Sequence, residues 1–297
     1  MKKTCWNVAF RKRNDKSNDF SVVPNPWWGW AADPFIVEEN GEIYIFAEIM
    51  NYFTQKGCIG YIKIKNGKPE KWQSVISEWY HLSYPFIWKD EGGFHICAES
   101  CRVKRTYRYD CKRFPDKWEK SFVYNEGLKL ADTTMFFDNE GQIEKCFSYI
   151  ISEQGDALIS LDIDYKGGYK VLTKDLHVAR MAGAFVKEGT EIYRMGQICD
   201  KSYGEGIVIN RIDCMEPYKE TVIREIYCNE FPVKSEFNII GVHTYNRSQN
   251  YEVLDIRYYH TNVIDTVFTY VIRFCNFIGR NFLKVIKGVR CIKKNTE

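Results

Sequence analysis

The sequence predicts an all-β fold, a five-bladed β-propeller followed by a C-terminal amphipathic helix. The main observation is a unit of strand, Gly- or Asn-marked turn and aromatic-rich strand, which recurs five times at about 50-residue spacing. The copies are ADPFIVEENGEIYIFAE (32–48), SYPFIWKDEGGFHICAES (83–100), ADTTMFFDNEGQIEKCFSY (131–149), AGAFVKEGTEIYRMGQ (182–197) and GVHTYNRSQNYEVLDI (241–256). This period is typical of blades, each a four-stranded sheet beside a central channel.

The repeat divides the chain into a propeller over residues 1–260 and a tail over residues 261–297. Aromatic residues make up 16% of the chain, and such residues favour strands. The segment TCWNVAFR, residues 4–11, is expected to pair with the last blade and close the ring. Closure of this kind removes an open sheet edge.

The tail has a different pattern, with apolar residues at helical spacing between residues 262 and 292. They are Ile264, Val267, Val271, Phe274, Ile278, Phe282, Val285 and Val289. Seven Lys and Arg residues lie in the same tail, too many for a transmembrane span. A basic amphipathic helix suits an anionic membrane surface. The alternative is a helix that packs back onto the propeller, with its basic side chains in solvent.

Charge and cysteine content exclude some classes of protein. The tail holds seven basic residues and two acidic ones, so 35 basic and 37 acidic residues are left for the rest of the chain. This nearly neutral balance argues against a nucleic-acid-binding face on the propeller. Eleven cysteines without a regular spacing, and an N-terminus without an apolar core, predict a cytoplasmic location. We expect no metal and no cofactor. A zinc site at His95, Cys97, Cys101 and Cys111 is less favoured than ordinary buried cysteines.

Hairpin geometry places the polar ends of all five repeats at one rim of the channel. In each repeat the turn lies midway between two residues, one in each strand of the hairpin. Because the two strands run antiparallel, these residues come to the same end of the blade. The expected pairs are Asp33 with Glu48, Tyr84 with Glu99, Asp132 with Ser148, Ala182 with Gln197 and His243 with Asp255. The sequence therefore predicts a polar site at this rim, with contributions from every blade.

Four carboxylates of this rim are the candidate catalytic residues: Asp33, Asp132, Glu99 and Glu48. Glycoside chemistry needs two opposed carboxyl groups, about 5 Å apart for a nucleophile and roughly 6.5 to 9.5 Å when water fits between them. Pro34 is expected to hold Asp33 in an extended conformation at the strand start. Alternatively, Asp33 and Asp132 only cap backbone amides where their blades begin.

Seven further residues are candidates for substrate binding. Arg194 suits a phosphate or a sugar carboxylate, His243 suits proton transfer, and Trp30 suits stacking on a sugar face. Each also has an ordinary explanation as a packing or hydrogen-bonding residue. The set is Trp30, His81, Tyr84, Arg194, Gln197, Tyr203 and His243.

The order of the blade motifs carries a family resemblance. Five blade motifs follow one another between residues 25 and 258: ADPF, YPF with a downstream AES, ADTTMFF, AGAF with YRMGQ and YGEG, and GVHTYN. This series resembles the N-terminal domain of plant glucosamine inositolphosphorylceramide transferases and their bacterial relatives. That domain is in the five-bladed propeller group of furanosidase-type glycoside hydrolases. The resemblance implies that Asp33 activates water and that Asp132 tunes pKa and orients substrate.

The chain departs from those hydrolases at one position. Where they carry a fourth-blade acid in an E-G-P motif, this chain reads Ala182-Gly183-Ala184. An ordinary inverting mechanism would then need Glu99 or Glu48 to supply the proton. The sequence favours an enzyme that acts on a glycosidic linkage in cell-surface glycan assembly, on a glycan or lipid-linked sugar. A glycan-binding module without catalysis is the second hypothesis, and a protein-interaction propeller is the third.

Overall fold

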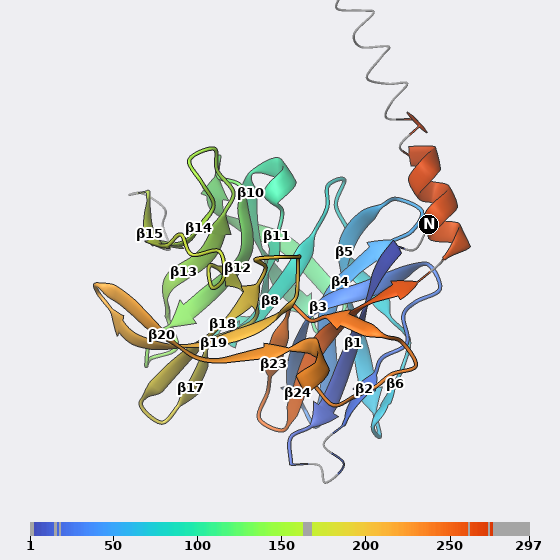
Figure 1. Cartoon of the computed structure of the whole chain (residues 1–297), viewed down its shortest axis with the longest axis horizontal. Helices are drawn as coiled ribbons and strands as arrows, with labels where there is room; N and C mark the ends of the chain where they lie inside the picture. Colours follow the sequence, from blue (N-terminus) through green and yellow to red (C-terminus); the bar gives the residue numbers. More distant parts are fainter. Residues whose placement is uncertain are drawn as a thin grey trace, which may run out of the picture.

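A computed structural model describes residues 3–14, 17, 19–162, 168–260, 262–272 and 274–275. Five sheets, antiparallel except for one parallel strand pair at the edge of the fifth, stand around a common centre as the blades of a propeller (Figure 1). In the first four blades the first strand lies at the centre and later strands lie farther out, whereas the fifth blade takes its outer strands from the N-terminal segment and from residues 233–234. The predicted fold class is confirmed.

The first three blades follow one another along the chain. Blade one runs in the order β3-β4-β5-β6, with β7 also on β5, blade two in the order β8-β9-β10-β11 and blade three in the order β12-β13-β14-β15. Their strands are β3 (Gly29–Glu39), β4 (Glu42–Asn51), β5 (Lys56–Lys65), β6 (Lys68–Pro69), β7 (Gln73–Ile76), β8 (Ser83–Asp90), β9 (Gly93–Glu99), β10 (Arg105–Arg113), β11 (Lys117–Glu126), β12 (Leu130–Phe137), β13 (Ile143–Ile150), β14 (Ala157–Leu161) and β15 (Tyr169–Thr173). A short 3-10 turn, η1 (Cys101–Val103), joins β9 to β10.

Blade four has an inner edge made of two short strands. Both β16 and β17 pair with β18, and β19 and β20 continue outward. The strands are β16 (Arg180–Met181), β17 (Val186–Glu188), β18 (Glu191–Ile198), β19 (Gly206–Met215) and β20 (Tyr218–Tyr227). The interruption contains Gly183, whose φ of +149° suits glycine. A Cβ there would lie 2.1 Å from the carbonyl oxygen of Tyr245, so only glycine allows blades four and five to approach this closely.

The N-terminal strand closes the ring, as the sequence predicts. In blade five β1 pairs with β24 along ten residues, from Lys3 opposite His260 to Lys12 opposite Tyr251. The first and last strands of the propeller therefore form one sheet. Its strands are β22 (Ile239–Gly241), β23 (Tyr245–Arg247), β24 (Tyr251–His260), β1 (Lys3–Lys12), β2 (Phe20–Val22) and β21 (Val233–Lys234), with η2 (Cys228–Glu230) before β21.

Apolar side chains fill the spaces between neighbouring blades. Phe46 of β4 and Ile96 of β9 belong to the cluster between blades one and two, and Ala31 of β3 and Val253 of β24 to the one between blades one and five. These side chains are almost fully buried. Burial of apolar area is the main stabilising contribution, at roughly 25 cal/mol per Å². It fixes each blade against the next, and so fixes the residues at the channel.

The inner strands of blades one to three share an irregular start. Pairing with the second strand shifts register between Ala32 and Phe35, between Ser83 and Phe86, and between Ala131 and Thr134. Each shift contains a residue in the left-handed region, with φ of +53° at Asp33, +43° at Tyr84 and +51° at Asp132. The expectation of an extended Asp33 is therefore wrong. Its amide and carboxylate bond to other blades, and these contacts override the preference set by Pro34.

The tail begins as a helix, with residues 263–272 and 274–275 helical. The expected apolar positions Ile278, Phe282, Val285 and Val289 lie outside the described residues. Within the described part of the chain, no helix is long and apolar enough to cross a membrane.

Candidate functional site

A pocket of about 200 Å³ lies at the channel end where β3 begins and β4 ends. Four carboxyl side chains reach it from different strands: Asp33 from β3, Glu48 from β4, Glu99 from β9 and Asp132 from β12. The complete lining is Trp6, Trp30, Ala32, Asp33, Glu48, Met50, His81, Ser83, Glu99, Asp132, Arg180, Tyr203 and His243. The prediction that the four carboxylates converge is confirmed, whereas their catalytic role stays a prediction.

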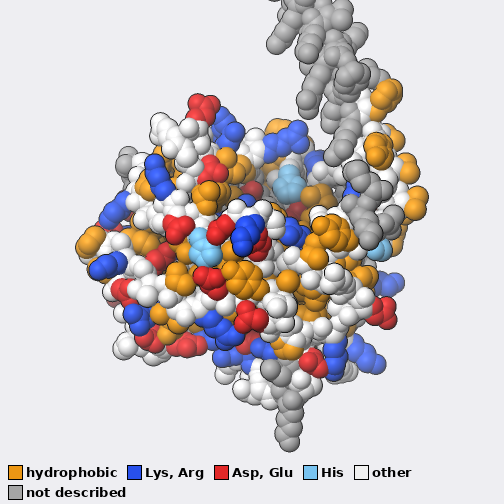
Figure 2. Space-filling view, viewed as in Figure 1, with side chains coloured by type: hydrophobic (Ala, Val, Ile, Leu, Met, Phe, Trp, Pro, Cys, Tyr) orange, Lys and Arg blue, Asp and Glu red, His pale blue; other side chains and the backbone are white. Residues whose placement is uncertain are grey.

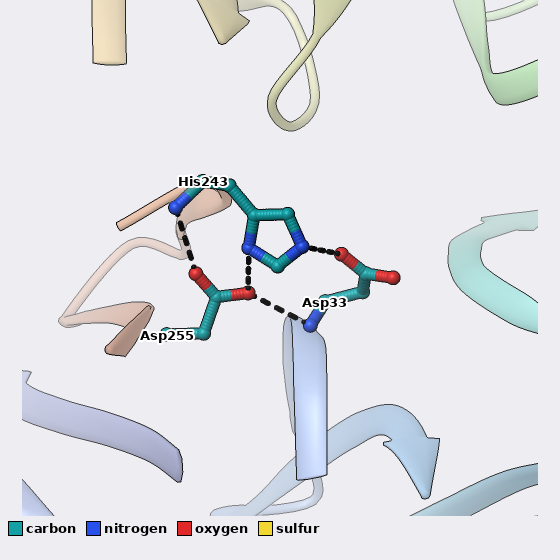
Figure 3. Close-up of side chains that lie close together, drawn as sticks. All are labelled: Asp33, His243 and Asp255. Atoms are coloured by element: carbon teal, nitrogen blue, oxygen red, sulfur yellow. Dashed lines mark hydrogen bonds and ion pairs between the residues drawn. The ribbon is translucent and has the colours of Figure 1, made fainter. Parts of the chain in front are cut away.

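Asp33 belongs to a buried triad with His243 and Asp255 (Figure 3). The Nε2 atom of His243 lies 3.2 Å from Asp33 Oδ1, and its Nδ1 atom lies 2.7 Å from Asp255 Oδ2. Asp255 also accepts hydrogen bonds from the backbone N–H groups of Asp33 (2.9 Å), His243 (2.9 Å) and Thr244 (3.0 Å). One carboxylate of blade five thus fixes both the imidazole and the backbone of blade one.

Charge balance in the triad follows from burial and the neighbouring groups. Burial favours the neutral imidazole of His243, but Asp255 and Asp33 outweigh it and raise its pKa. Burial also raises the pKa of Asp33 to about 6, against the opposing effect of His243. The triad therefore fits an imidazolium held between two carboxylates. Trp6 of β1 stacks on this imidazole with ring centroids 3.9 Å apart.

Glu48 faces His81 and Asp33. The Nδ1 atom of His81 accepts a hydrogen bond from the backbone N–H of Gly57 (2.9 Å), so the proton of the neutral ring is on Nε2. This Nε2 lies 3.4 Å from Glu48 Oε1. Burial lowers the pKa of His81 to about 4, so the ring is neutral near pH 7. Burial first, and then Asp33, raise the pKa of Glu48 well above its usual value.

Glu99 and Asp132 form a second carboxyl pair. Burial, and then the negative charge of Asp132, raise the pKa of Glu99 to about 8. Glu99 Oε2 also accepts a hydrogen bond from the backbone N–H of Asp132 (3.3 Å). On its other side, Asp132 Oδ2 is 2.5 Å from Nε of Arg180 and accepts from Gln197 Nε2 at 3.4 Å. Glu99 therefore holds a proton near pH 7 beside a carboxylate that is paired with a guanidinium.

The other predicted binding residues divide into three groups. Trp30, His81, Tyr203 and His243 line the pocket. Tyr84 and Gln197 are fully buried behind it and support the acids: the backbone N–H of Tyr84 donates to Asp33 Oδ2 (3.2 Å), and Gln197 contacts Asp132. The third group is Arg194 alone.

Arg194 is a correction, because it does not lie at the rim. Its side chain is fully buried in blade four, where its Nη2 atom lies 2.7 Å from Glu220 Oε1 of β20 and 2.7 Å from the carbonyl oxygen of Val178. The side-chain alternation of β18 turns Arg194 into the blade. It stabilises blade four and has no route to a substrate in the pocket.

Sequence reasoning missed Arg180, the pocket's guanidinium. Counting from the turn placed Ala182 opposite Gln197, but Gln197 in fact faces Arg180. The count failed because the inner strand breaks at Gly183, so β16 and β17 are two separate pairings. Arg180 stacks on Tyr203, with its guanidinium carbon 5.0 Å from the ring centroid. The sequence offered one signal for this residue, namely that the basic Arg180 stands two positions before the Ala182-Gly183-Ala184 motif.

Among the described residues, the triad is one group with side chains of the kind that bind metals, and the surroundings of His95 are the other place to examine, because the sequence suggested a zinc site there. Ligand atoms of Asp33, His243 and Asp255 lie within 4.8 Å of one another. These atoms, however, already face one another or accept backbone hydrogen bonds, which fits the ion-paired triad better than a coordination shell. At the second place, His95 is held between Asp90 (2.8 Å) and Asp110 (2.7 Å), and its ring nitrogens do not face the nearby cysteines.

Comparison with known proteins supports the inferred resemblance. Residues 20–144 match the family model described as glucosamine inositolphosphorylceramide transferase 1, N-terminal. The resemblance is confirmed. A glucosamine inositolphosphorylceramide transferase 1 of Arabidopsis thaliana is 27% identical over 214 residues, and one of Oryza sativa subsp. indica is 25% identical over 210. These alignments cover 65% of this chain but only 27% and 28% of the relatives, so the chain spans about a quarter of their length.

Solved structures share the fold at low sequence identity. An α-L-arabinofuranosidase from Podospora anserina, in complex with cellotriose, has a TM-score of 0.56 at 9% identity, over 86% of this chain and 98% of that chain. The catalytic domain of a Coprinopsis cinerea α-L-arabinofuranosidase has a TM-score of 0.56 at 8% identity, over 84% and 97%. These likenesses show the propeller architecture.

Proposed function

We propose that this protein is an enzyme that transfers or hydrolyses a sugar at a glycosidic linkage in the central pocket. The observation that carries the proposal is the pair Glu99 and Asp132. Glu99, with a pKa of about 8, can donate a proton near neutral pH, while Arg180 neutralises the charge of Asp132. A proton donor beside carboxylates is the requirement of glycosidic bond cleavage. Glu99 from blade two would then replace the acid that blade four lacks.

Asp33 takes the role of base or cation stabiliser. His243 and Asp255 orient it, and Thr244 Oγ1 donates a hydrogen bond to Asp33 Oδ1 at 3.0 Å. A carboxylate held on several sides is preorganised for a developing positive charge at the sugar ring. Burial and the neighbouring Asp33 raise the pKa of Glu48, which favours its protonated form. In this proposal Glu48 lies beside the base, Asp33, and helps to position it.

An amino sugar is the substrate class that we propose for this pocket, because the relatives' name refers to glucosamine. The four carboxyl groups do not give the pocket an excess of negative charge, since Glu99 is protonated near pH 7 and Asp33 and Asp132 are paired with His243 and Arg180. They would recognise the sugar's hydroxyl and amino groups by hydrogen bonds. The finer parts of the proposal are a lipid-linked sugar, a role in cell-surface glycan biosynthesis, and a place on the cytoplasmic side of an anionic membrane. The free thiols of the ten described cysteines agree with a reducing compartment.

The test combines turnover with sugar binding. Glycolipids extracted from membranes are incubated with the protein, with and without a nucleotide-activated hexosamine as donor, and hexosamine gained or lost is followed by mass spectrometry. We expect Asp33→Asn to abolish turnover while the circular dichroism spectrum stays native, and Asp200→Asn, at a surface ion pair with His177, to retain it. Full activity of Asp33→Asn would refute the assignment.

A non-catalytic glycan-binding module remains the second candidate, because Ala182 is buried and supplies no acid. This hypothesis predicts glucosamine binding, measured by ligand-observed NMR, that survives neutralisation of both Asp33 and Asp132, with no turnover on any glycolipid.

A further inference from the structure

The C-terminal helix contacts the propeller through its polar side. Its buried residues are Asp265 and Thr269, which are only 6% and 9% exposed. Lys3 of β1 donates to Asp265 Oδ2 (2.8 Å), and Gln55, between β4 and β5, donates to Asp265 Oδ1 (2.8 Å). Thr269 Oγ1 in turn donates to Gln55 Oε1 (2.8 Å). These contacts fix which side of the helix faces outward.

The outward side is apolar. Its residues are spaced i, i+4, i+7, i+8 and i+11, which places them on one face of a helix opposite Asp265. We call this face the outer stripe: Val263 (72% exposed), Val267 (50%), Tyr270 (56%), Val271 (48%) and Phe274 (64%). Hydrophobic side chains are visible along this helix at the upper right of Figure 2.

This arrangement reverses the usual packing of a surface helix, which buries its apolar stripe and exposes its polar side. Here a partly buried ion pair and several hydrogen bonds hold the helix on the propeller beside the contact of Phe268 with Phe53, so the exposed stripe does not result from loose packing. Contiguous apolar surface on a folded protein indicates a binding partner. The question is which partner covers the outer stripe.

We propose that the outer stripe inserts into the surface of an anionic lipid bilayer. Charge supports this occupant: seven Lys and Arg residues follow from residue 273 onward, with Glu297 as the single acid after Asp265. Asp265 is itself neutralised by Lys3. An apolar face joined to basic sequence is the composition of helices that lie in the interface of anionic membranes.

An aromatic cluster extends the surface from the helix to blade one. Phe268 packs against Phe53 with ring centroids 4.8 Å apart, and Phe53 packs against Trp27 at 5.7 Å. Trp27 is 74% exposed. Tryptophan is enriched at the interface between lipid and water. Trp27 therefore fits a second point of attachment beside the outer stripe.

The placement has a consequence for the substrate, which rests on the proposed function. The loop contacted by the helix joins the end of β4 to β5, and the end of β4 also supplies Met50 to the pocket. Helix and pocket thus lie at the same end of blade one. A membrane-bound molecule would receive its sugar from a lipid in the same surface.

Vesicle sedimentation of the full chain tests the proposal without any turnover. We expect binding to vesicles of equal parts phosphatidylcholine and phosphatidylglycerol, weakened by salt, and little binding to phosphatidylcholine alone. Val267→Asp/Val271→Asp should weaken binding at least tenfold, since each inserted valine contributes roughly that factor. The matched control is Val171→Asp/Val222→Asp, on outer strands at 43% and 45% exposure, which should bind as the native chain does.

Three results would overturn the proposal. The first is no binding of the native chain to anionic vesicles, and the second is an equal loss in the control. The third is a concentration-dependent dimer in light scattering that Val267→Asp/Val271→Asp abolishes, because the stripe would then bind a second copy. Asp33→Asn should bind vesicles normally, so a failure of the proposed function is distinguishable from a failure of this inference.

Discussion

Replacing Glu99 by glutamine tests the electrostatics of the pocket without a known substrate. The folded protein holds a proton on Glu99 up to about pH 8, whereas the unfolded chain releases it near the ordinary value of 4.5. Unfolding therefore releases a proton between these two pH values, and stability falls as pH rises through this window. The rise in pKa corresponds to about 5 kcal/mol at about 1.4 kcal/mol per pH unit. Because the charges of Asp132 and Arg180 act on Glu99 in opposite directions, we set about 2 kcal/mol as the smallest consistent effect.

A glutamine side chain cannot ionise, so this loss should be absent from Glu99→Gln. We expect the variant to match the native chain at about pH 4.5 and to be about 2 to 5 kcal/mol more stable at about pH 9. The measurement is urea unfolding followed by tryptophan fluorescence over this range. Glu126→Gln, at a side chain 62% exposed, is the control and should follow the native curve. The reasoning would be refuted if the free energy of unfolding of Glu99→Gln fell with rising pH as steeply as that of the native chain.

Substitutions at three other positions test the contacts and the charges around the pocket. Asp255→Ala removes the acceptor of three backbone N–H groups and the ion-pair partner of the His243 imidazole, and should cost about 4 kcal/mol in urea unfolding; a loss below about 1 kcal/mol would contradict the triad's structural role. Gly183→Ala brings a Cβ within 2.1 Å of the Tyr245 carbonyl and should cost about 3 kcal/mol, so an unchanged thermal midpoint would contradict the close approach. Arg180→Gln removes a cation that lowers the pKa of Glu99, and should move the pH optimum of turnover upward, with partial recovery in Arg180→Lys; an unmoved profile would exclude this role.

Hairpin counting from the sequence placed most of the site correctly. The turn at Asn40 and Gly41 sets Glu48 opposite Ala32, one residue from the predicted partner Asp33. The same method placed His243 beside Asp255, which the structure shows in contact. The period of two in strands carries this information, because both strands of a hairpin are counted from one turn.

Counting failed where the backbone leaves the regular ladder. The break at Gly183 places Arg180, and not Ala182, opposite Gln197. The register shifts at Asp33 and Asp132 leave both of these side chains at the pocket. Arg194 illustrates the other failure: an arginine at a strand centre suggests a binding residue, but its partner Glu220 comes from the next hairpin outward. Arg194 of β18 and Glu220 of β20 lie on strands that share no turn, so counting residues from a turn cannot bring them together.

The sequence by itself determined the five blades and the end of each blade at which its polar residues gather, because period and turn chemistry are local properties of the chain. Closure by the N-terminal strand was an expectation from edge removal, and the pairing of β1 with β24 confirms it. Only the tertiary structure decided that Arg180 and Trp6 enter the pocket and that Glu99 holds a proton there. It also decided that the C-terminal helix turns Asp265 inward and its apolar stripe outward. These outcomes depend on burial and on charges from different blades, and no stretch of sequence contains both partners.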